Sequence, residues 1–411
     1  MNPLARSPLR IAYLLKKFPR LSETFVLNEI LAQEALGTHI EVLARRPRDP
    51  EPLHPQFARL QASIREIDSA RSLEPWVQLF EPDNAKLLER FGQCVRELKR
   101  FEHPRIAGLL AEALEVRARA LAADIRHIHA HFATDSAVVA MLVRELGGPP
   151  YSITAHAKDI YRSTVNPELL SRMFERSAFT VTVCDANVRH LEGMLTPSAL
   201  GRVRRLYNGI DLDMFRSHGT TRDADHVLCV GRLVEKKGYR VLIDALALLR
   251  DEGRRFQATF IGEGEERAAI EARIADTRLQ QHITLAGGLD QTAVRACMAR
   301  ATLMCMPCIV GDDGNRDALP TTLIEAGAME LPSISTPVTG IPEILGHGSA
   351  GVLVPENDVP ATARAIAGLL DDPTRARALG RAARTRCEEL FDGRKSAATL
   401  REWFAESVQR G

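Results

Sequence analysis

Short apolar runs alternate with longer amphipathic stretches along most of this chain. Apolar runs of about five residues predict buried strands, and apolar residues at helical spacing predict helices over 239–250 and 265–277. The predicted strands cover 10–15, 39–44, 127–131, 151–155 and 180–184 in the first half, and 226–231, 258–262, 282–286, 303–306 and 333–336 in the second. Strand and helix alternate in two blocks, which predicts an α/β fold with two doubly wound, Rossmann-like domains.

Two stretches interrupt this pattern. Between 208 and 222, Gly, Asp and polar residues replace the apolar runs, which marks a domain boundary. We therefore predict an N-terminal domain over 1–208, a C-terminal domain over 209–385, and helices over 386–411 that pack back on the N-terminal domain. Residues 45–123 begin with a Pro-rich loop and continue as a charged helical stretch, which we interpret as an insertion. The insertion either shapes an acceptor site or forms a solvated helical face.

The composition narrows the class of protein. The chain has 411 residues, of which 45% are hydrophobic and 26% charged, so it is globular and long enough for two separate cores. A formal net charge of +1 argues against a bulk nucleic-acid binder. Seven scattered cysteines favour a reducing cytoplasm over a disulfide framework. The pair Cys305 and Cys308 lies in an apolar run and predicts buried core thiols.

The apolar segments are too short for targeting or spanning a membrane. The first run has five residues, against roughly 7 to 15 in a signal peptide, and 137–143 is far below the roughly 20 that a spanning helix needs. Lys16, Lys17 and Arg20 beside Phe18 fit either a peripheral contact with anionic lipid or a loop that lines a cleft. We expect a cytoplasmic protein.

Two cations follow the first predicted strand of the second half. The strand HVLCV leads into GRLVEKKG, which places Arg232 and Lys237 on a glycine turn. Ligands of doubly wound sheets bind at the carboxyl ends of strands, so both cations are expected to face the crevice. Arg suits bidentate phosphate contact and Lys adds a mobile point charge. We predict that they clamp a diphosphate, and that Arg232→Ala or Lys237→Ala cuts turnover while leaving the melting curve nearly unchanged.

The segment GDDGNRDALPTTLIEAGAMELPSISTPVTGIPEIL carries a second group of polar residues. Pro320 predicts a helix start, and the backbone amides of Thr321 and Thr322 then lie at its positive end, which favours phosphate. Asp317 precedes this helix, and Glu325, eight positions further along the chain, lies inside it. The two carboxylates fit sugar hydroxyls on one side of a diphosphate and ribose hydroxyls on the other. This is the outline of a nucleotide-sugar site.

Four histidines lie on or after strands of the first half. His156 directly follows the strand YSITA, where it fits hydrogen bonding or proton transfer at a crevice, or a structural role. His127, His129 and His131 alternate along IRHIHAHF and so share one strand face. The flanking pattern is that of a partly buried strand, so we predict no metal site and retain only His131, at the strand end, as a site residue.

Two shorter motifs carry no prediction of function. Gly262 and Gly264 follow a strand, but the third glycine of a dinucleotide turn is missing. Asp211 and Asp213 match a D-x-D metal motif, but they lie in the linker, where Asp is a natural turn and helix-cap residue.

The second half resembles the retaining glycosyltransferases of family 4, which have the two-domain GT-B fold. The resemblance lies in YNGIDLDMF, VLCVGRLVEKKGYRVLIDALALL, FIGEGEER, ITLAGGLDQ and RDALPTTLIEAGAMELPSISTPVTGIPEIL. In the first half, FPRLSETFVLNEI, HIHAHF and ITAHAKDIY resemble a subgroup associated with exopolysaccharide and cell-surface glycan assembly. The resemblance implies two domains that face each other across a cleft, with a C-terminal helix returning to the N-terminal domain.

The resemblance also implies roles for residues at the matching positions. On the donor side it implies that Arg232, Lys237 and the amides of Thr321 and Thr322 bind the diphosphate. It implies that Asp317 binds the donor sugar, that Glu325 binds the ribose, and that the base lies beside Gly288 and Leu289. Leu319 is expected among the donor contacts, and His156 is expected at the reacting centre. On the acceptor side, Ser22, Glu23, Thr24 and His131 are expected. The family usually has Glu in place of Asp317, and many members have paired glycines where this chain has the loop with Ser22 to Thr24.

The expected reaction is transfer of a sugar from a nucleotide diphosphate sugar to a saccharide or lipid-linked saccharide. Retention of configuration is implied by the resemblance alone. No metal or cofactor is expected, because Arg232, Lys237 and the helix start would stabilise the charge that develops on the diphosphate. Two alternatives are a nucleotide-sugar epimerase or hydrolase of similar fold, and a non-catalytic sugar-nucleotide-binding protein.

Overall fold

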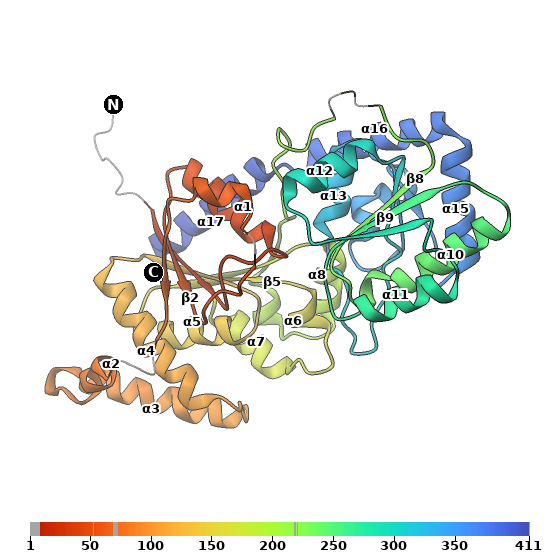
Figure 1. The fold of residues 1–411 in the computed structure, drawn as a ribbon. Helices are drawn as coiled ribbons and strands as arrows, with labels where there is room; N and C mark the ends of the chain where they lie inside the picture. The colour runs from red at the N-terminus through yellow and green to blue at the C-terminus, as the bar shows by residue number, and fades with distance from the viewer. Residues whose placement is uncertain (1–8, 52, 69–72, 218, 220, 411) are drawn as a thin grey trace, which may run out of the picture.

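The computed structural model describes residues 9–51, 53–68, 73–217, 219 and 221–410. Two open sheets stand side by side, each with helices on both of its faces (Figure 1). All strand pairs in both sheets are parallel. The prediction of two doubly wound, Rossmann-like sheets is therefore confirmed.

The first sheet has seven strands in the order β3-β2-β1-β4-β5-β6-β7. Its strands are β1 Arg10–Leu15, β2 His39–Ala44, β3 Ser63–Glu66, β4 His127–His131, β5 Tyr151–Ala155, β6 Phe179–Thr182 and β7 Val203–Arg205. Its helices are α1 Thr24–Ala35, α2 Glu74–Val77, α3 Ala85–Arg100, α4 Ile106–Ala122, α5 Asp135–Glu145, α6 Ala157–Tyr161, α7 Pro167–Arg176, α8 Asp185–Glu192 and α9 Pro197–Leu200, with the 3-10 turns η1 Pro55–Arg59, η2 Gln78–Phe80 and η3 Pro82–Asn84.

The second sheet has six strands in the order β10-β9-β8-β11-β12-β13. Its strands are β8 His226–Val230, β9 Gln257–Ile261, β10 Ile283–Gly287, β11 Leu303–Cys305, β12 Ser333–Ser335 and β13 Val352–Leu353. Its helices are α10 Tyr239–Asp251, α11 Arg267–Asp276, α12 Gln291–Arg300, α13 Thr321–Ala328, α14 Ile341–Ile344, α15 Val359–Asp371 and α16 Pro373–Leu390, with the turns η4 Glu235–Lys237 and η5 Gly346–Gly348. The chain ends with α17 Gly393–Arg410.

The ten predicted strands are all present, with ends that differ by a residue or two. The structure adds β3, β7 and β13, which the apolar pattern does not predict. β3 has four residues, all of them exposed, and β7 and β13 are shorter still. Edge strands that are exposed or only two to three residues long are too short or too polar to give an apolar run in the sequence.

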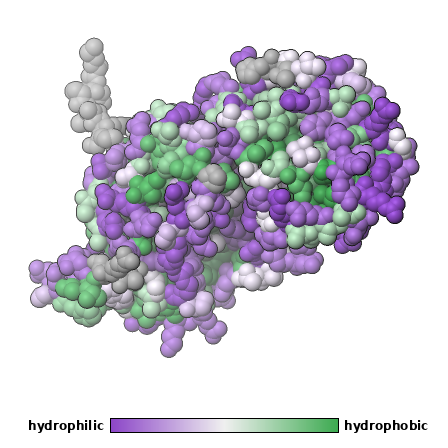
Figure 2. Space-filling view, viewed as in Figure 1, coloured by the Kyte–Doolittle hydropathy of each residue, from purple (hydrophilic) through white to green (hydrophobic). Residues whose placement is uncertain are grey.

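The predicted insertion over 45–123 is only partly an insertion. α4 buries one face in the core of the first sheet, where it packs on α5. It is therefore the helix that leads into β4, which is part of the framework. α2 and α3 project from it as an arm (Figure 1), and Figure 2 shows apolar surface at the end of this arm. Leu73, Val77 and Phe80, which lie just before, on and just after α2, are exposed.

The C-terminal helix returns to the first sheet, as predicted. Leu400 and Phe404 of α17 are buried among residues of β1, β2 and α1. The amide of Gln33 on α1 donates a hydrogen bond to the backbone oxygen of Ala397 at 2.7 Å. The returning chain runs beside the linker that connects the two sheets. The N–H of Gly393, at the start of α17, donates to the backbone oxygen of Ile210 in this linker at 2.9 Å. The predicted limit between 385 and 386 falls inside α16, which packs on α13.

None of the helices among the described residues combines the length and apolar character that crossing a bilayer requires.

Candidate active site

The carboxyl ends of strands from both sheets meet at one cleft. Its volume is about 540 Å³, and it is lined by the loops that follow β1, β4 and β5 of the first sheet and β8, β9, β10 and β11 of the second. Figure 2 shows a hollow where the halves built on the two sheets meet. Because ligands of parallel α/β sheets bind at the carboxyl ends of strands, this cleft is the candidate active site.

A buried ion pair lies at the floor of the cleft. Lys237 Nζ lies 2.7 Å from Asp317 Oδ2, and Lys236 Nζ lies 3.0 Å from Asp317 Oδ1. Burial alone would raise the pKa of Asp317, but the two ammonium groups hold it well below its usual range. Burial would lower the pKa of Lys237, but the Asp317 carboxylate reverses this and raises it. Asp317 and Lys237 are therefore both charged at neutral pH.

Local backbone geometry places Lys237 there. Lys237 closes the turn η4, and Gly238 after it has a positive φ of 69°. A Cβ at Gly238 would lie 1.9 Å from the backbone oxygen of Pro307, so only glycine lets these two segments approach. The hydroxyl of Tyr239 donates to the oxygen of Gly231 at 2.7 Å, which ties the start of α10 to the end of β8.

Arg232 lines the same cleft but is much more exposed than Lys237. Its side chain is 54% exposed, and its nearest carboxylate is that of Glu265, at 3.5 Å. Arg232 and Lys237 both line the cleft. The guanidinium is thus a solvated cation at the rim, while the ammonium of Lys237 is a fixed and partnered cation below it.

Helix α13 points its N-terminus into the cleft. The residues around its start, Leu319, Pro320, Thr321 and Thr322, all line the cleft. Pro320 is the cap residue rather than the first helical residue, and no described side chain caps this end. The first-turn amides and the helix dipole therefore make this end a site that favours an anion.

Glu325 lies one turn further along α13 and is 5% exposed. Burial raises the pKa of Glu325 to about 7, against a small opposing effect of Gln291. Gln291 also contacts Gln56 of η1, so an amide pair from the two halves meets beside this carboxylate. Sequence reasoning missed both glutamines, because only the tertiary fold brings η1 next to α12.

The turns that follow β8 and β9 are packed backbone to backbone. Gly262 has a φ of 145°, and a Cβ there would lie 1.9 Å from the oxygen of Gly231. This glycine therefore serves the packing of two strand ends, which agrees with rejecting a dinucleotide turn. Gly288 and Leu289 line the same side of the cleft.

His156 caps helix α6 at the end of β5 and lines the cleft from the first half. Asp159 Oδ2 accepts from its backbone N–H at 3.0 Å. Its ring lies against Phe25 and Phe132, with centroids 4.8 and 4.5 Å away. Burial, with help from His131 and Lys158, holds the pKa of His156 well below its usual value, so the ring is neutral at pH 7.

The loop after β1 contributes Ser22, Glu23 and Thr24 to the cleft. Two residues outside the predicted set hold it in place. Glu51 accepts from the backbone N–H of Leu21 at 2.9 Å, and the ring of His54 donates to the oxygen of Leu21 at 2.9 Å. Both come from the Pro-rich loop, for which the sequence suggested no such contact.

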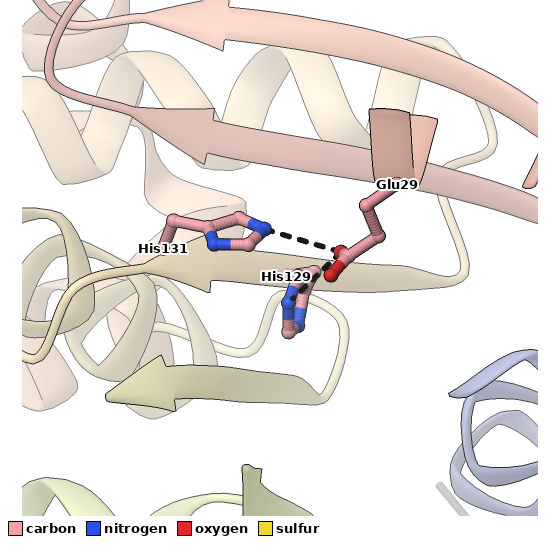
Figure 3. A group of neighbouring side chains, drawn as sticks. All are labelled: Glu29, His129 and His131. Atoms are coloured by element: carbon pink, nitrogen blue, oxygen red, sulfur yellow. Dashed lines mark hydrogen bonds and ion pairs between the residues drawn. The ribbon is translucent and has the colours of Figure 1, made fainter. Parts of the chain in front are cut away.

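His131 differs from the prediction. It is fully buried and lies one layer behind His156, with 3.4 Å between its Nδ1 and Nε2 of His156. The alternation that put His127, His129 and His131 on one face is correct, but that face packs against α1 and α17 and does not line the cleft. Figure 3 shows Glu29 of α1 beside His129 and His131.

Of the fourteen residues predicted for the site, all except His131 line this one cleft. They are Ser22, Glu23, Thr24, His156, Arg232, Lys237, Gly288, Leu289, Asp317, Leu319, Thr321, Thr322 and Glu325. Their individual roles stay predictions. Asp211 is a turn residue, as predicted. Its carboxylate accepts from the N–H groups of Asp213 and Met214 at 3.0 and 3.1 Å. Cys305 and Cys308 are buried free thiols, as predicted.

The fold as a whole is similar to solved glycosyltransferases. Sucrose-phosphate synthase from Thermosynechococcus elongatus superposes with a TM-score of 0.77 at 19% identity, covering 98% of this chain and 100% of that one. HepE from Anabaena, solved in complex with UDP and glucose, gives a TM-score of 0.75 at 14% identity, covering 97% and 99%. Two Rossmann-like sheets with a shared cleft and a returning C-terminal helix define the GT-B class of glycosyltransferases.

Sequence comparison carries this further. The model for Glycosyltransferase Family 4 matches residues 22–214, and that for Glycosyl transferases group 1 matches residues 212–386. The chain is 30% identical over 377 residues to WcaL of Escherichia coli, named as a colanic acid biosynthesis glycosyltransferase, covering 87% of this chain and 90% of WcaL. It is 28% identical over 407 residues to the amylovoran biosynthesis glycosyltransferase AmsK of Erwinia amylovora, covering 93% and 96%. The chain belongs to glycosyltransferase family 4 and is an enzyme of the hexosyltransferase type.

Proposed function

We propose that this enzyme transfers a sugar, with retention of configuration, from a nucleotide diphosphate sugar to a saccharide or lipid-linked saccharide acceptor. The names of WcaL and AmsK support exopolysaccharide or surface glycan assembly as its setting. HepE, which shares the fold, was solved with UDP and glucose, which supports a nucleotide sugar as donor. The observation that carries the proposal is the convergence of Arg232, Lys237 and the start of α13 on one cleft.

The donor binds along the second sheet. The diphosphate lies between Arg232 and the N-terminus of α13, with Lys237 below it, and Glu325 accepts from the ribose hydroxyls. The cations and the helix dipole stabilise the charge that builds on the departing phosphate, which is the kind of electrostatic effect that dominates many enzymes. The departing phosphate also takes the proton of the acceptor hydroxyl, so no separate carboxylate base and no metal is needed. His156 and Asp317 contact the sugar at the reacting centre.

The acceptor enters from the first sheet. Ser22, Glu23 and Thr24 form the wall that faces the second half, on a loop held by Glu51 and His54. A lipid-linked acceptor would bring the enzyme to the cytoplasmic face of a membrane as a peripheral protein. Closure of the two halves over both substrates would exclude water and complete the site.

A donor screen tests the proposal. Isothermal calorimetry with UDP-, GDP- and ADP-sugars is expected to find one donor that binds with micromolar affinity, and that affinity is expected to fall at least about tenfold in Arg232→Ala. The matched control is Arg240→Ala, which removes another exposed arginine eight positions along, outside the cleft lining. Donor consumed without any acceptor would indicate an epimerase or hydrolase, and equal donor affinity in both variants would exclude the diphosphate clamp.

A further inference from the structure

A chain of three side chains leads from helix α1 to the cleft. Glu29 Oε1 lies 3.1 Å from Nε2 of His131, and Nδ1 of His131 lies 3.4 Å from Nε2 of His156. His131 is fully buried, and the rings of His131 and His156 are stacked with centroids 5.7 Å apart. Figure 3 shows Glu29 reaching from α1 to the edge of the His131 ring (Figure 3).

The direction of each hydrogen bond in this chain is set by Glu29. An ionised carboxylate can only accept, so Nε2 of His131 must carry the hydrogen. The hydroxyl of Tyr13 donates to the same oxygen at 2.9 Å, and burial raises the pKa of Tyr13 well above its usual value, so this hydroxyl keeps its proton. With its hydrogen on Nε2, the imidazole form of His131 has its lone pair on Nδ1, and the 3.4 Å contact with His156 then requires a hydrogen on Nε2 of His156.

We infer that Glu29 and His131 are positioning residues that fix the tautomer of His156 in the cleft. The proton is held on Nε2 and the lone pair is left on Nδ1, so the side chain, which also faces the N–H of Asp159 in the capping box of α6, can accept from a hydroxyl at Nδ1 but cannot donate to a phosphate oxygen there. This inference rests on the proposed contact of His156 with the sugar. It makes the pair a determinant of how a sugar hydroxyl is oriented, at residues that touch no substrate.

The rest of the histidine cluster supports this reading over a metal site. The ligand atoms of Glu29, His129 and His131 do lie within 4.8 Å of one another. Both ring nitrogens of His129, however, already have hydroxyl partners, Ser152 at 2.8 Å and Thr154 at 3.0 Å. Nε2 of His131 and Oε1 of Glu29 lie 3.1 Å apart, the distance of a direct hydrogen bond, so the two groups satisfy each other without an ion.

Histidine tautomers can be measured directly. Protein labelled with ¹⁵N-histidine is studied by long-range ¹H–¹⁵N correlation without substrate, and the signals of His131 and His156 are assigned from His131→Gln and His156→Gln. The expected result is that both rings carry hydrogen on Nε2. In Glu29→Gln the side-chain amide can donate to His131, so a share of both rings is expected to switch to the Nδ1–H tautomer.

Kinetics of the same variants show whether the tautomer matters. Glu29→Gln is expected to lower kcat at least about tenfold with little change in donor KM, because it alters only the group that acts through His156. The matched control is Tyr13→Phe, which removes the other hydrogen bond to Glu29 and keeps the ring. It is expected to leave the His156 tautomer unchanged and kcat within about twofold.

Three results would overturn the inference. The first is that His156 carries its hydrogen on Nδ1 in the unaltered protein. The second is that Glu29→Gln changes neither the tautomer nor kcat. The third is that a chelator removes one equivalent of bound metal from the purified protein. If Glu29→Gln does not fold, the tautomer in the unaltered protein decides alone. An enzyme that transfers no sugar would refute the proposed function but not the tautomer, while an active enzyme with the other tautomer would refute only the inference.

Discussion

Lys237 and Asp317 form a buried ion pair, with Nζ 2.7 Å from Oδ2, at the floor of the cleft between the two sheets. Lys236 holds the other carboxylate oxygen at 3.0 Å. Asp317 is therefore anchored by two ammonium groups.

Removal of Lys237 should cost stability as well as activity. Lys237→Met leaves the Asp317 carboxylate buried with only Lys236 as a partner, which is expected to cost about 1 to 3 kcal/mol of unfolding free energy. Arg232→Ala removes an exposed cation and is expected to stay within about 0.5 kcal/mol. Urea unfolding of both variants measures this difference. The sequence alone predicts a nearly unchanged melting curve for both variants. The structure changes this prediction for Lys237, whose removal is expected to lower the free energy of unfolding measurably.

The double variant Lys237→Met with Asp317→Asn separates the two effects. It removes the carboxylate that has lost one of its two ammonium partners but leaves Lys236 without a carboxylate, so part of the lost stability is expected to return, while turnover stays at least about a hundredfold below the unaltered enzyme. Recovery of turnover together with stability would mean that Lys237 serves folding alone.

Glu325 predicts a pH dependence of donor binding. Burial raises its pKa to about 7, and only the carboxylate form accepts from both ribose hydroxyls. Donor affinity is therefore expected to rise about tenfold between pH 6 and pH 8 as this group loses its proton. Calorimetry in Glu325→Gln should show weak binding with a flat pH profile. If the variant keeps the slope, another group is responsible.

The same pKa shift has a consequence for stability. A carboxyl group whose pKa is raised by folding contributes stability that is fully present below its unfolded pKa and is lost as pH rises through about 7. Glu325→Gln is therefore expected to be more stable than the unaltered protein at pH 8 and no more stable at pH 4. Urea midpoints at the two pH values test the sign.

The sequence allowed much of this site to be predicted because its main features are local. A strand end, a glycine turn and a helix start can each be recognised within about ten residues, which is how Arg232, Lys237 and Glu325 were placed together. The contacts that could not be predicted join distant segments. Gln56 contacts Gln291 only because η1 packs beside α12, and Glu29 contacts His131 only because α1 packs on β4. The sequence also does not predict that α4 lies in the core, because charged residues such as Glu112 and Glu115 occur on its buried face.

Gly238 should tolerate no side chain. Gly238→Ala combines a positive φ of 69° with a Cβ that would lie 1.9 Å from the oxygen of Pro307. The matched control is Gly253→Ala, where φ is 76° but nothing lies within 4 Å of the added atom. The control is expected to cost about 1 kcal/mol and Gly238→Ala at least about 3 kcal/mol. Because the backbone shift also moves Lys237, only Gly238→Ala is expected to lose donor affinity. Equal losses of stability in the two variants would show that strain in φ, and not the close approach, explains this glycine.

Glu343 joins the two halves of the molecule away from the cleft lining. Its carboxylate, on α14 of the second half, accepts from the N–H groups of Asp185 and Ala186 at 2.9 Å each, at the start of α8 of the first half. The hydroxyl of Tyr207 donates to it at 2.9 Å. A buried carboxylate at a helix N-terminus gains from both the amides and the helix dipole.

Glu343→Gln should therefore loosen the connection between the halves. The amide has one acceptor oxygen in place of two, so at least one N–H of α8 loses its partner, which is expected to cost about 1.5 to 3 kcal/mol and about 2 to 4 °C in Tm. Glu389→Gln, an exposed position on α16, is the control and is expected to shift Tm by less than about 1 °C. Scanning calorimetry of both variants measures the difference. If Glu343→Gln melts like the control, the hold of α14 on α8 comes from apolar packing around Ile341 and Ile344 and not from the carboxylate.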